Sequence, residues 1–145
     1  MPERLSRYLR LSAGERRLLH EALGILCRVW WRSRRRDLDE LLADERPSTT
    51  HFSAPPAGQG GDAVAEISHA LRRAANVLGG RANCLPQALA ARHMLRTRGV
   101  HGVLYVGVCK DSSGLRSHAW VQAQGQAVVG GADNAAFRVV AERAF

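Results

Sequence analysis

Cys84 and His118 are residue types that together can carry out nucleophilic catalysis, and each lies in an informative local sequence. Cys84 opens the segment CLPQALAARHMLR, and His118 lies in SHAWVQ. A thiol attacks as its thiolate, and a histidine can take up the thiol proton. A helix N-terminus favours a thiolate through its unpaired N–H groups and its partial positive charge. The alternative is that Cys84 simply packs in the interior, as most free cysteines do.

A third group is expected to hold the imidazole of His118 in one tautomer. The strand that contains His118 is followed by a glycine-containing turn and a second apolar run, which predicts a hairpin. A turn at 124–125 pairs His118 with Gly131, and a turn at 125–126 pairs it with Asp133. Both registers place Asp133 on the His118 face, so Asp133 is the predicted acid. The alternatives are Asn134 and Glu142.

The N-terminal third of the chain predicts helices followed by a linker. Ser12 and Glu15 form a capping box ahead of apolar residues at helical spacing, which predicts a helix to about Trp31. The segment RDLDELLAD predicts a second, short helix. The proline- and glycine-rich segment DERPSTTHFSAPPAGQGGD is typical of a linker. Asp62 is then a candidate cap for a third helix over 63–79.

The helix that follows begins at Asn83 or Cys84, because Pro86 lacks an N–H group and is tolerated only in a first turn. Gly99 ends it. Alternating residues predict strands over 101–110, 115–123 and 127–133, whereas 134–145 is ambiguous between strand and short helix. Helices followed by antiparallel strands indicate an α+β fold. We divide the chain into an N-terminal helical segment (1–45), a flexible linker (46–62) and a core domain (63–145).

The charge and the cysteine content limit the function classes. The formal net charge is +8, which is typical of many nucleic-acid-binding proteins. However, the arginines gather mainly in RSRRR (32–36), without aromatic interleaving or a recognition motif, so no nucleic-acid partner is expected. The three cysteines form no CxxC motif, which argues against a zinc site and a disulfide framework. Free thiols fit the cytoplasm.

The apolar run LLHEALGILCRVWW is interrupted by charged residues and falls short of a membrane span. The other two cysteines are expected to be structural. Cys27 lies on an apolar helix face, and Cys109 lies on a strand without a nearby base.

Two blocks of this sequence resemble a known family. CLPQALAARHMLRTRGVHGVLYVGV followed by SHAWVQAQGQAVVGG is similar to the lasso-peptide leader peptidases, the microcin-J-type processing proteins with a transglutaminase-like core. The opening RYLRLSAGERRLLHEALGILCRVWWR resembles the helical start of their stand-alone members. The resemblance implies a papain-like cysteine protease core, in which a helix bearing the cysteine packs on an antiparallel sheet.

The resemblance also implies roles for individual residues. Cys84 matches the nucleophile and His118 the histidine of a Cys–His–Asp triad. The family's acid lies nearer the histidine, about where Gly130 and Gly131 stand here, so Asp133 is a shifted match. Trp120 and Gln87 are candidate residues of the substrate cleft. No metal or cofactor is implied.

The implied activity is removal of the leader from a ribosomally made precursor peptide, before a separate asparagine-synthetase-like cyclase closes the macrolactam. No strand pattern upstream of residue 63 builds a winged-helix domain, and no sheet edge is predicted on which an extended leader adds a strand. We therefore expect a separate small leader-recognition protein of winged-helix type, docked on the helix that ends in Trp30 and Trp31. The alternative functions are a transglutaminase-like acyltransferase and a non-catalytic basic binding module.

Overall fold

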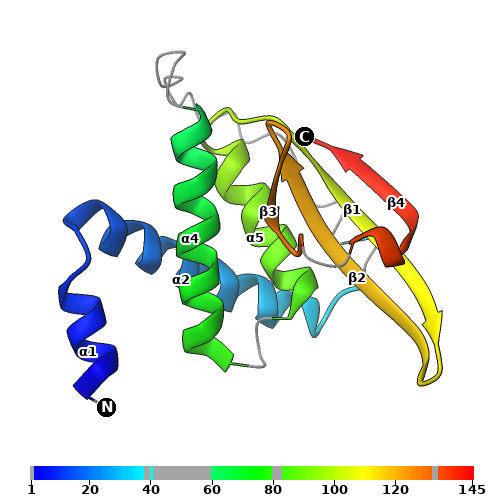
Figure 1. Cartoon of the computed structure of the whole chain (residues 1–145), viewed down its shortest axis with the longest axis horizontal. Helices are drawn as coiled ribbons and strands as arrows, with labels where there is room; N and C mark the ends of the chain where they lie inside the picture. Colours follow the sequence, from blue (N-terminus) through cyan, green and yellow to red (C-terminus); the bar gives the residue numbers. More distant parts are fainter. Residues whose placement is uncertain (1, 38–39, 41–59, 80–82, 132–133) are drawn as a thin grey trace.

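The chain folds into a layer of helices beside one antiparallel sheet, which confirms the predicted α+β class (Figure 1). The computed structural model describes residues 2–37, 40, 60–79, 83–131 and 134–145. The helices are α1 (Pro2–Leu9), α2 (Ala13–Ser33), α4 (Gly60–Leu78), α5 (Cys84–Arg96) and the 3₁₀ helix η2 (Asn134–Ala136). The strands are β1 (Gly102–Asp111), β2 (Gly114–Ala123), β3 (Gln126–Val129) and β4 (Arg138–Ala144).

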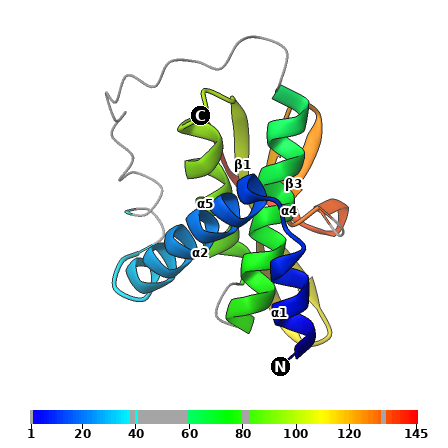
Figure 2. The same ribbon diagram turned by 90° about the vertical axis from the view of Figure 1, so that its left-hand side faces the viewer.

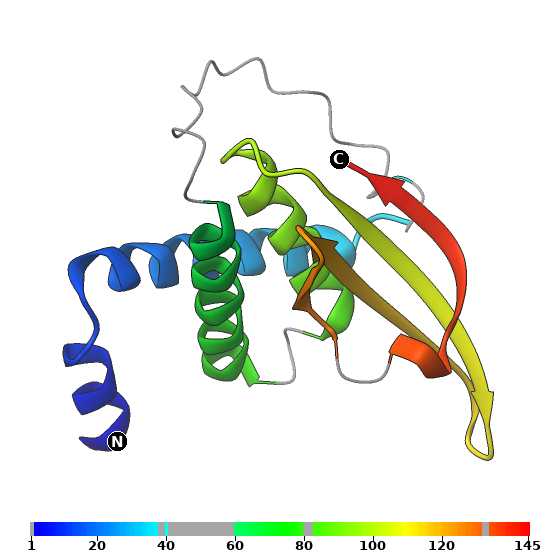
Figure 3. The same ribbon diagram turned by 45° about the horizontal axis from the view of Figure 1, so that its top comes forward.

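Helix α5 lies between the other helices and the sheet. It contacts α2 and α4 on one side and β1, β2 and β3 on the other. Figure 2 shows α2 crossing in front of α4 and α5, and Figure 3 shows the sheet on the far side of α5 from α2. A helix packed on both sides needs apolar residues around most of its surface. The buried residues of α5 are Pro86, Ala88, Leu89, Ala90, Ala91, Arg92, Met94 and Leu95.

The start of α5 agrees with the sequence prediction. Asn83 is the N-cap residue and Cys84 the first helical residue, so Pro86 falls in the first turn. At the other end Gly99 adopts a φ of +67°, which glycine reaches without steric cost. The chain then turns directly into β1.

The capping box at the start of α2 is also confirmed. The Glu15 N–H donates to Ser12 Oγ over 3.2 Å, and the Ser12 N–H donates to Glu15 Oε2 over 2.9 Å. Arg73 of α4 donates to the same carboxylate over 3.0 Å. The hydrogen bond from the Ser12 backbone N–H lowers the pKa of Glu15 most, and the hydrogen bond from the Arg73 side chain lowers it further. This carboxylate therefore caps α2 and also links it to α4.

Helix α2 belongs to the same hydrophobic core as α4, α5 and the sheet. Its buried residues are Leu19, Ala22, Ile25 and Leu26. Cys27 is exposed, so the prediction that it packs on an apolar face is wrong. The buried residues of α2 recur every three to four residues on the side of the helix that faces the core. Cys27 lies on the outer side. Among the described helices, none is long and apolar enough to cross a membrane.

Two boundaries differ from the predictions around the linker. Helix α4 begins at Gly60, so Asp62 lies within its first turn instead of capping it. Most of the predicted short helix RDLDELLAD and of the linker lies outside the described residues. Helix α1 lies within the predicted N-terminal helical segment, and its Tyr8 ring stacks on the His20 ring of α2 at a centroid distance of 5.8 Å.

The sheet has the strand order β3-β2-β1-β4, with every neighbouring pair antiparallel. The third strand ends at Val129, four residues earlier than predicted, and the ambiguous C-terminal segment forms both η2 and β4. Strand β4 is an edge strand whose residues are mostly exposed. The expectation that no sheet edge is available is therefore wrong, because the C-terminal segment pairs with β1 and, among the described residues, no strand pairs with its outer side.

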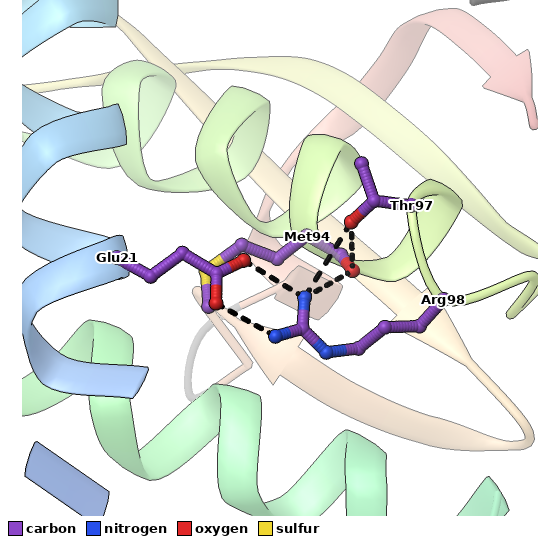
Figure 4. Close-up of polar contacts among 4 residues, drawn as sticks. All are labelled: Glu21, Met94, Thr97 and Arg98. Atoms are coloured by element: carbon purple, nitrogen blue, oxygen red, sulfur yellow. Dashed lines mark hydrogen bonds and ion pairs between the residues drawn. The ribbon is translucent and has the colours of Figure 1, made fainter. Parts of the chain in front are cut away.

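One ion pair joins α2 to the C-terminal end of α5 (Figure 4). The Arg98 guanidinium donates to both carboxylate oxygens of Glu21, over 2.9 and 2.7 Å. Its Nη1 also donates to the carbonyl of Met94 over 3.0 Å, as does the Thr97 hydroxyl. Arg98 therefore satisfies a carbonyl at the end of α5 while it holds α2 in place.

We predict that Arg98→Ala lowers the free energy of unfolding by about 1–2 kcal/mol. A bidentate ion pair that also satisfies a carbonyl at a helix end contributes more to stability than an ordinary surface ion pair. Arg98→Lys should recover only part of this stability, since an ammonium group cannot form the bidentate pair with Glu21. The measurement is urea denaturation followed by circular dichroism.

The matched control is Arg116→Ala, which removes a 3.2 Å ion pair to Asp111 on the more exposed β1–β2 hairpin and a longer contact, of 6.0 Å, with the Phe137 ring. It should lower the free energy of unfolding much less than Arg98→Ala does, because the pair is exposed to solvent. Equal losses for Arg98→Ala and Arg116→Ala would contradict the role given to Arg98.

Candidate active site

Cys84 is half-buried as the first residue of α5. The side chain of Asn83 makes no capping hydrogen bond to the first turn. Because Pro86 has no N–H group, the unpaired donors of this turn that can face a ligand are those of Cys84 and Leu85. This arrangement suits a thiolate, and it also suits an oxyanion formed next to the sulfur.

His118 lies half-buried in the middle of β2, in a group of aromatic rings. Its ring stacks on Trp120 at a centroid distance of 5.7 Å and lies tilted on Phe137 at 5.0 Å. Trp120 stacks in turn on Tyr105 at 5.4 Å. Gly107 pairs with His118 across the strands, and a Cβ at Gly107 would lie 2.9 Å from Phe137 Cβ and 3.0 Å from the Trp120 ring. The aromatic group therefore needs a glycine beneath it.

The ring of His118 has one hydrogen-bond partner among the described residues, the main-chain carbonyl of Gly130. The distance from His118 Nε2 to this oxygen is 2.9 Å. Gly130 has a φ of +72°, and a Cβ there would lie 2.9 Å from the Ala119 carbonyl and 3.0 Å from His118 Nε2. Only glycine fits this position without displacing the histidine.

The β2–β3 hairpin does not extend as far as His118, and this leaves Gly130 in a turn. The turn residues are Gln124 and Gly125, as in the first of the two predicted registers. A bulge between Val121 and Gln122 then shifts the pairing by one residue, so that Val121 pairs with Val129. The expected pairing of His118 with Gly131 is therefore wrong: β3 ends before that level, and the chain turns at Gly130 across the His118 ring.

Cys84 and His118 come from elements that pack together, α5 and β2. In the described part of the chain no hydrogen bond joins their side chains. Alternation along β2 puts Ala119 and Val121 in the core with α5, whereas His118 leaves the strand on the other side. Strand β3 pairs with β2 only from Val121 onward, so β2 is an edge strand at His118. A contact between Cys84 and His118 has to be made around this edge.

Cys109 is closer to His118 in the sheet than the sequence indicated. Cys109 pairs with Arg116 on β2, and Gly107 pairs with His118, so Cys109 is a diagonal neighbour of His118 on the same face. Cys109 is half-buried. The expectation that it has no nearby base is wrong, because only the β1–β2 register brings the two residues together. Experiments on the nucleophile must therefore distinguish Cys84 from Cys109.

The remaining predicted site residues have different outcomes. Asp133 lies outside the described residues. Asn134 is half-buried in η2, and its Oδ1 atom is buried without a hydrogen-bond partner, whereas Glu142 is exposed on β4. Trp120 is 4% exposed and packs between aromatic rings. Gln87 is half-buried one turn after Cys84 on α5.

Two contacts of His118 were not predicted from the sequence, those with Phe137 and with the Gly130 carbonyl. The GG pair at 130–131 signals an unusual backbone conformation, which is the one clue the sequence offers. No group of three or more His, Cys, Asp and Glu side chains is placed to hold a metal ion within the residues that the structure describes.

Comparison with known proteins identifies the family. Residues 19–142 match the Transglutaminase-like superfamily, a range that includes most of α2, all of α4 and α5, and nearly all of the sheet. No curated protein and no solved structure gave a match. The superfamily includes cysteine peptidases and acyltransferases and is typically catalytic. Because the match covers most of the chain, with Cys84 at the start of a helix that packs on the strand of His118, the protein belongs to the transglutaminase-like superfamily.

Proposed function

We propose that this protein is a cysteine peptidase that removes the leader from a ribosomally synthesised lasso-peptide precursor, in the cytoplasm. The observation that carries the proposal is the position of Cys84, half-buried as the first residue of a helix, in a chain of the transglutaminase-like superfamily. The blocks around Cys84 and His118 that resemble the leader peptidases both lie within the matched range.

In the proposed reaction Cys84 and His118 act as nucleophile and base. The Cys84 sulfur attacks the scissile carbonyl carbon as its proton passes to His118, and the carbonyl oxygen becomes an oxyanion near the first N–H groups of α5. The C–N bond then breaks, His118 returns the proton to the leaving amine, and a thioester remains. Water attacks the thioester, giving a proton to His118, and the C–S bond breaks to restore the thiol.

The products suit the proposed place in lasso-peptide synthesis. The leaving amine is the N-terminal α-amine of the core peptide, which a separate asparagine-synthetase-like cyclase uses for the macrolactam. If an amine instead of water resolved the thioester, the enzyme would be an acyltransferase with the same residues. The mass of the leader product distinguishes the two, because hydrolysis leaves a free carboxylate.

The C-terminal end of α2 is the surface that we propose for the separate leader-recognition protein. Trp30, Trp31, Arg34 and Arg35 line an open cavity of about 590 Å³. Trp31 is 54% exposed, and the Arg35 guanidinium lies 3.9 Å from its ring centroid. The earlier turns of α2 pack in the core, so this end alone offers a large exposed ring. The described residues upstream of 60 form helices, which is consistent with the need for a partner that binds the leader.

We predict that Cys84→Ala lowers leader cleavage by at least about 10³-fold, because the nucleophile is lost. Cys27→Ser and Cys109→Ser should each keep most of the activity. Since Cys27 is exposed, alkylation by iodoacetamide is best followed by peptide mapping in the Cys27→Ser background. Activity that survives Cys84→Ala and is lost in Cys109→Ser would assign the nucleophile to Cys109.

We predict that His118→Ala is nearly as damaging as Cys84→Ala, and that the double variant is no worse than either, because the two residues act as a unit. Asp133→Asn should cost less than either, because the described hydrogen bond of the His118 ring goes to the Gly130 carbonyl. The measurement is kcat/KM on the precursor peptide. Additive losses in the double variant would show that Cys84 and His118 do not share one step.

We predict that the purified protein cleaves its precursor slowly, and that the recognition protein raises the rate by holding the leader near the site at an effective concentration of about millimolar. Trp31→Ala should remove most of this increase while the rate without partner stays the same. Val77→Ala is the matched control, since Val77 is 57% exposed on α4. Full-rate, leader-specific cleavage by this chain alone would overturn the partner proposal and would point to the open β4 edge as the leader site.

A further inference from the structure

We infer that the main-chain carbonyl of Gly130 is the positioning group for His118 and performs the orienting task for which the sequence predicted Asp133. His118 Nε2 lies 2.9 Å from the Gly130 oxygen. A carbonyl can only accept a hydrogen bond, so this contact requires the proton on Nε2. The free electron pair is then on Nδ1, which becomes the nitrogen that accepts the thiol proton.

The aromatic surroundings of the ring limit its movement in addition to the hydrogen bond. Trp120 stacks against the His118 ring, and Phe137 lies against it at a centroid distance of 5.0 Å. These contacts restrict the plane of the imidazole but do not distinguish its two nitrogens. The Gly130 carbonyl supplies that distinction, because it lies next to one nitrogen only.

The backbone at Gly130 is shaped for this contact. Its φ of +72° lies in the left-handed region, and it follows directly on Val129, where the pairing of β3 with β2 ends, so that its carbonyl can reach His118 Nε2. A side chain at position 130 would come within 3.0 Å of His118 Nε2 and within 2.9 Å of the Ala119 carbonyl. A carboxylate attached at this position would thus occupy the space of the ring that it is meant to orient.

A neutral carbonyl acceptor also has a consequence for the reaction cycle. Nε2 carries its proton in the neutral imidazole and in the imidazolium, so the bond to Gly130 persists while Nδ1 gains and loses the thiol proton. The ring therefore does not have to turn between the two half-reactions. This role rests on the proposed function, but the tautomer itself is a property of the free protein.

The test is the tautomer of His118 in the full-length protein, measured by two-bond ¹H–¹⁵N NMR at a pH at which imidazole is neutral. His118→Gln identifies the signals of this residue among the six histidines. We expect a protonated Nε2 and a bare Nδ1, and we expect Asp133→Asn to leave this pattern unchanged. The reverse tautomer in the wild type, or a change of tautomer in Asp133→Asn, would overturn the inference.

A pair of glycine variants tests the contact itself. Gly130→Ala and Gly125→Ala both place alanine at a positive φ, of +72° and +73°, but the Gly125 position is open whereas the Gly130 position meets His118. We expect Gly130→Ala to lose the single tautomer and to lower kcat by about 10²-fold or more with little change in KM. Gly125→Ala should keep the wild-type tautomer.

The same tautomer in both glycine variants, with the same kcat, would contradict the inference. If Gly130→Ala does not fold, the tautomer of His118 in the wild-type and Asp133→Asn spectra still tests the inference. The spectra need no substrate, so failure of the peptidase proposal and failure of this inference are distinguishable: a defined Nε2–H tautomer without peptidase activity would refute only the former.

Discussion

The packing of α5 on two sides is the constraint on which the rest of this structure depends. A helix that contacts α2 and α4 on one side and the sheet on the other cannot place charged residues freely, and it needs small residues where neighbours approach closely. Ala88, Ala90 and Ala91 are fully buried, and their small side chains allow this close approach. Because the axis of α5 is fixed by these contacts, its first residue, Cys84, is held at a defined place at the start of the helix. The position of the candidate nucleophile thus follows from core packing.

On the face of the sheet away from α5, the structure is constrained instead by the space that the aromatic rings occupy. Trp120 and Phe137 both lie over Gly107, and the turn at Gly130 passes over the His118 ring. At each glycine a single Cβ would come to about 3 Å of a ring or a carbonyl. These two glycines therefore matter for the space that they leave open, and each acts on the surroundings of the candidate base. A mutation at either one is expected to affect His118 before it affects the core.

Some arginines of this protein form ion pairs between helices at its surface, and others contact tryptophan rings. Arg73 and Arg98 pair with Glu15 and Glu21 and connect α2 to α4 and α5, so part of the basic excess stabilises the helical layer. Arg34 and Arg35 lie instead over Trp30 and Trp31. This arrangement covers tryptophan faces with cations while an open cavity remains between them. An exposed aromatic and basic surface of this kind fits a protein partner with complementary acidic and apolar groups.

The sequence by itself determined the features that depend on neighbouring residues. The Ser12–Glu15 capping box and the helix start forced by Pro86 are local, because each depends on backbone geometry within a few residues. The hairpin turn was narrowed to 124–125 or 125–126, and the structure places it at Gln124–Gly125. The α+β class follows from the order of these elements, and the similarity of the two motif blocks was sufficient to indicate the superfamily that the comparison established.

Only the tertiary structure decided the surroundings of His118. The bulge after Val121 and the end of β3 at Val129 have no local signal, yet they remove the expected pairing of His118 with Gly131 and leave Gly130 in a turn whose carbonyl lies beside His118 Nε2. The proximity of Cys109 to His118 arises from the register between β1 and β2, and that of Phe137 from a chain segment that crosses the sheet between β3 and β4. Cys27 is exposed because the core takes up a different side of α2. Contacts between residues far apart in sequence depend on how all the elements pack at once, and local patterns do not carry that information.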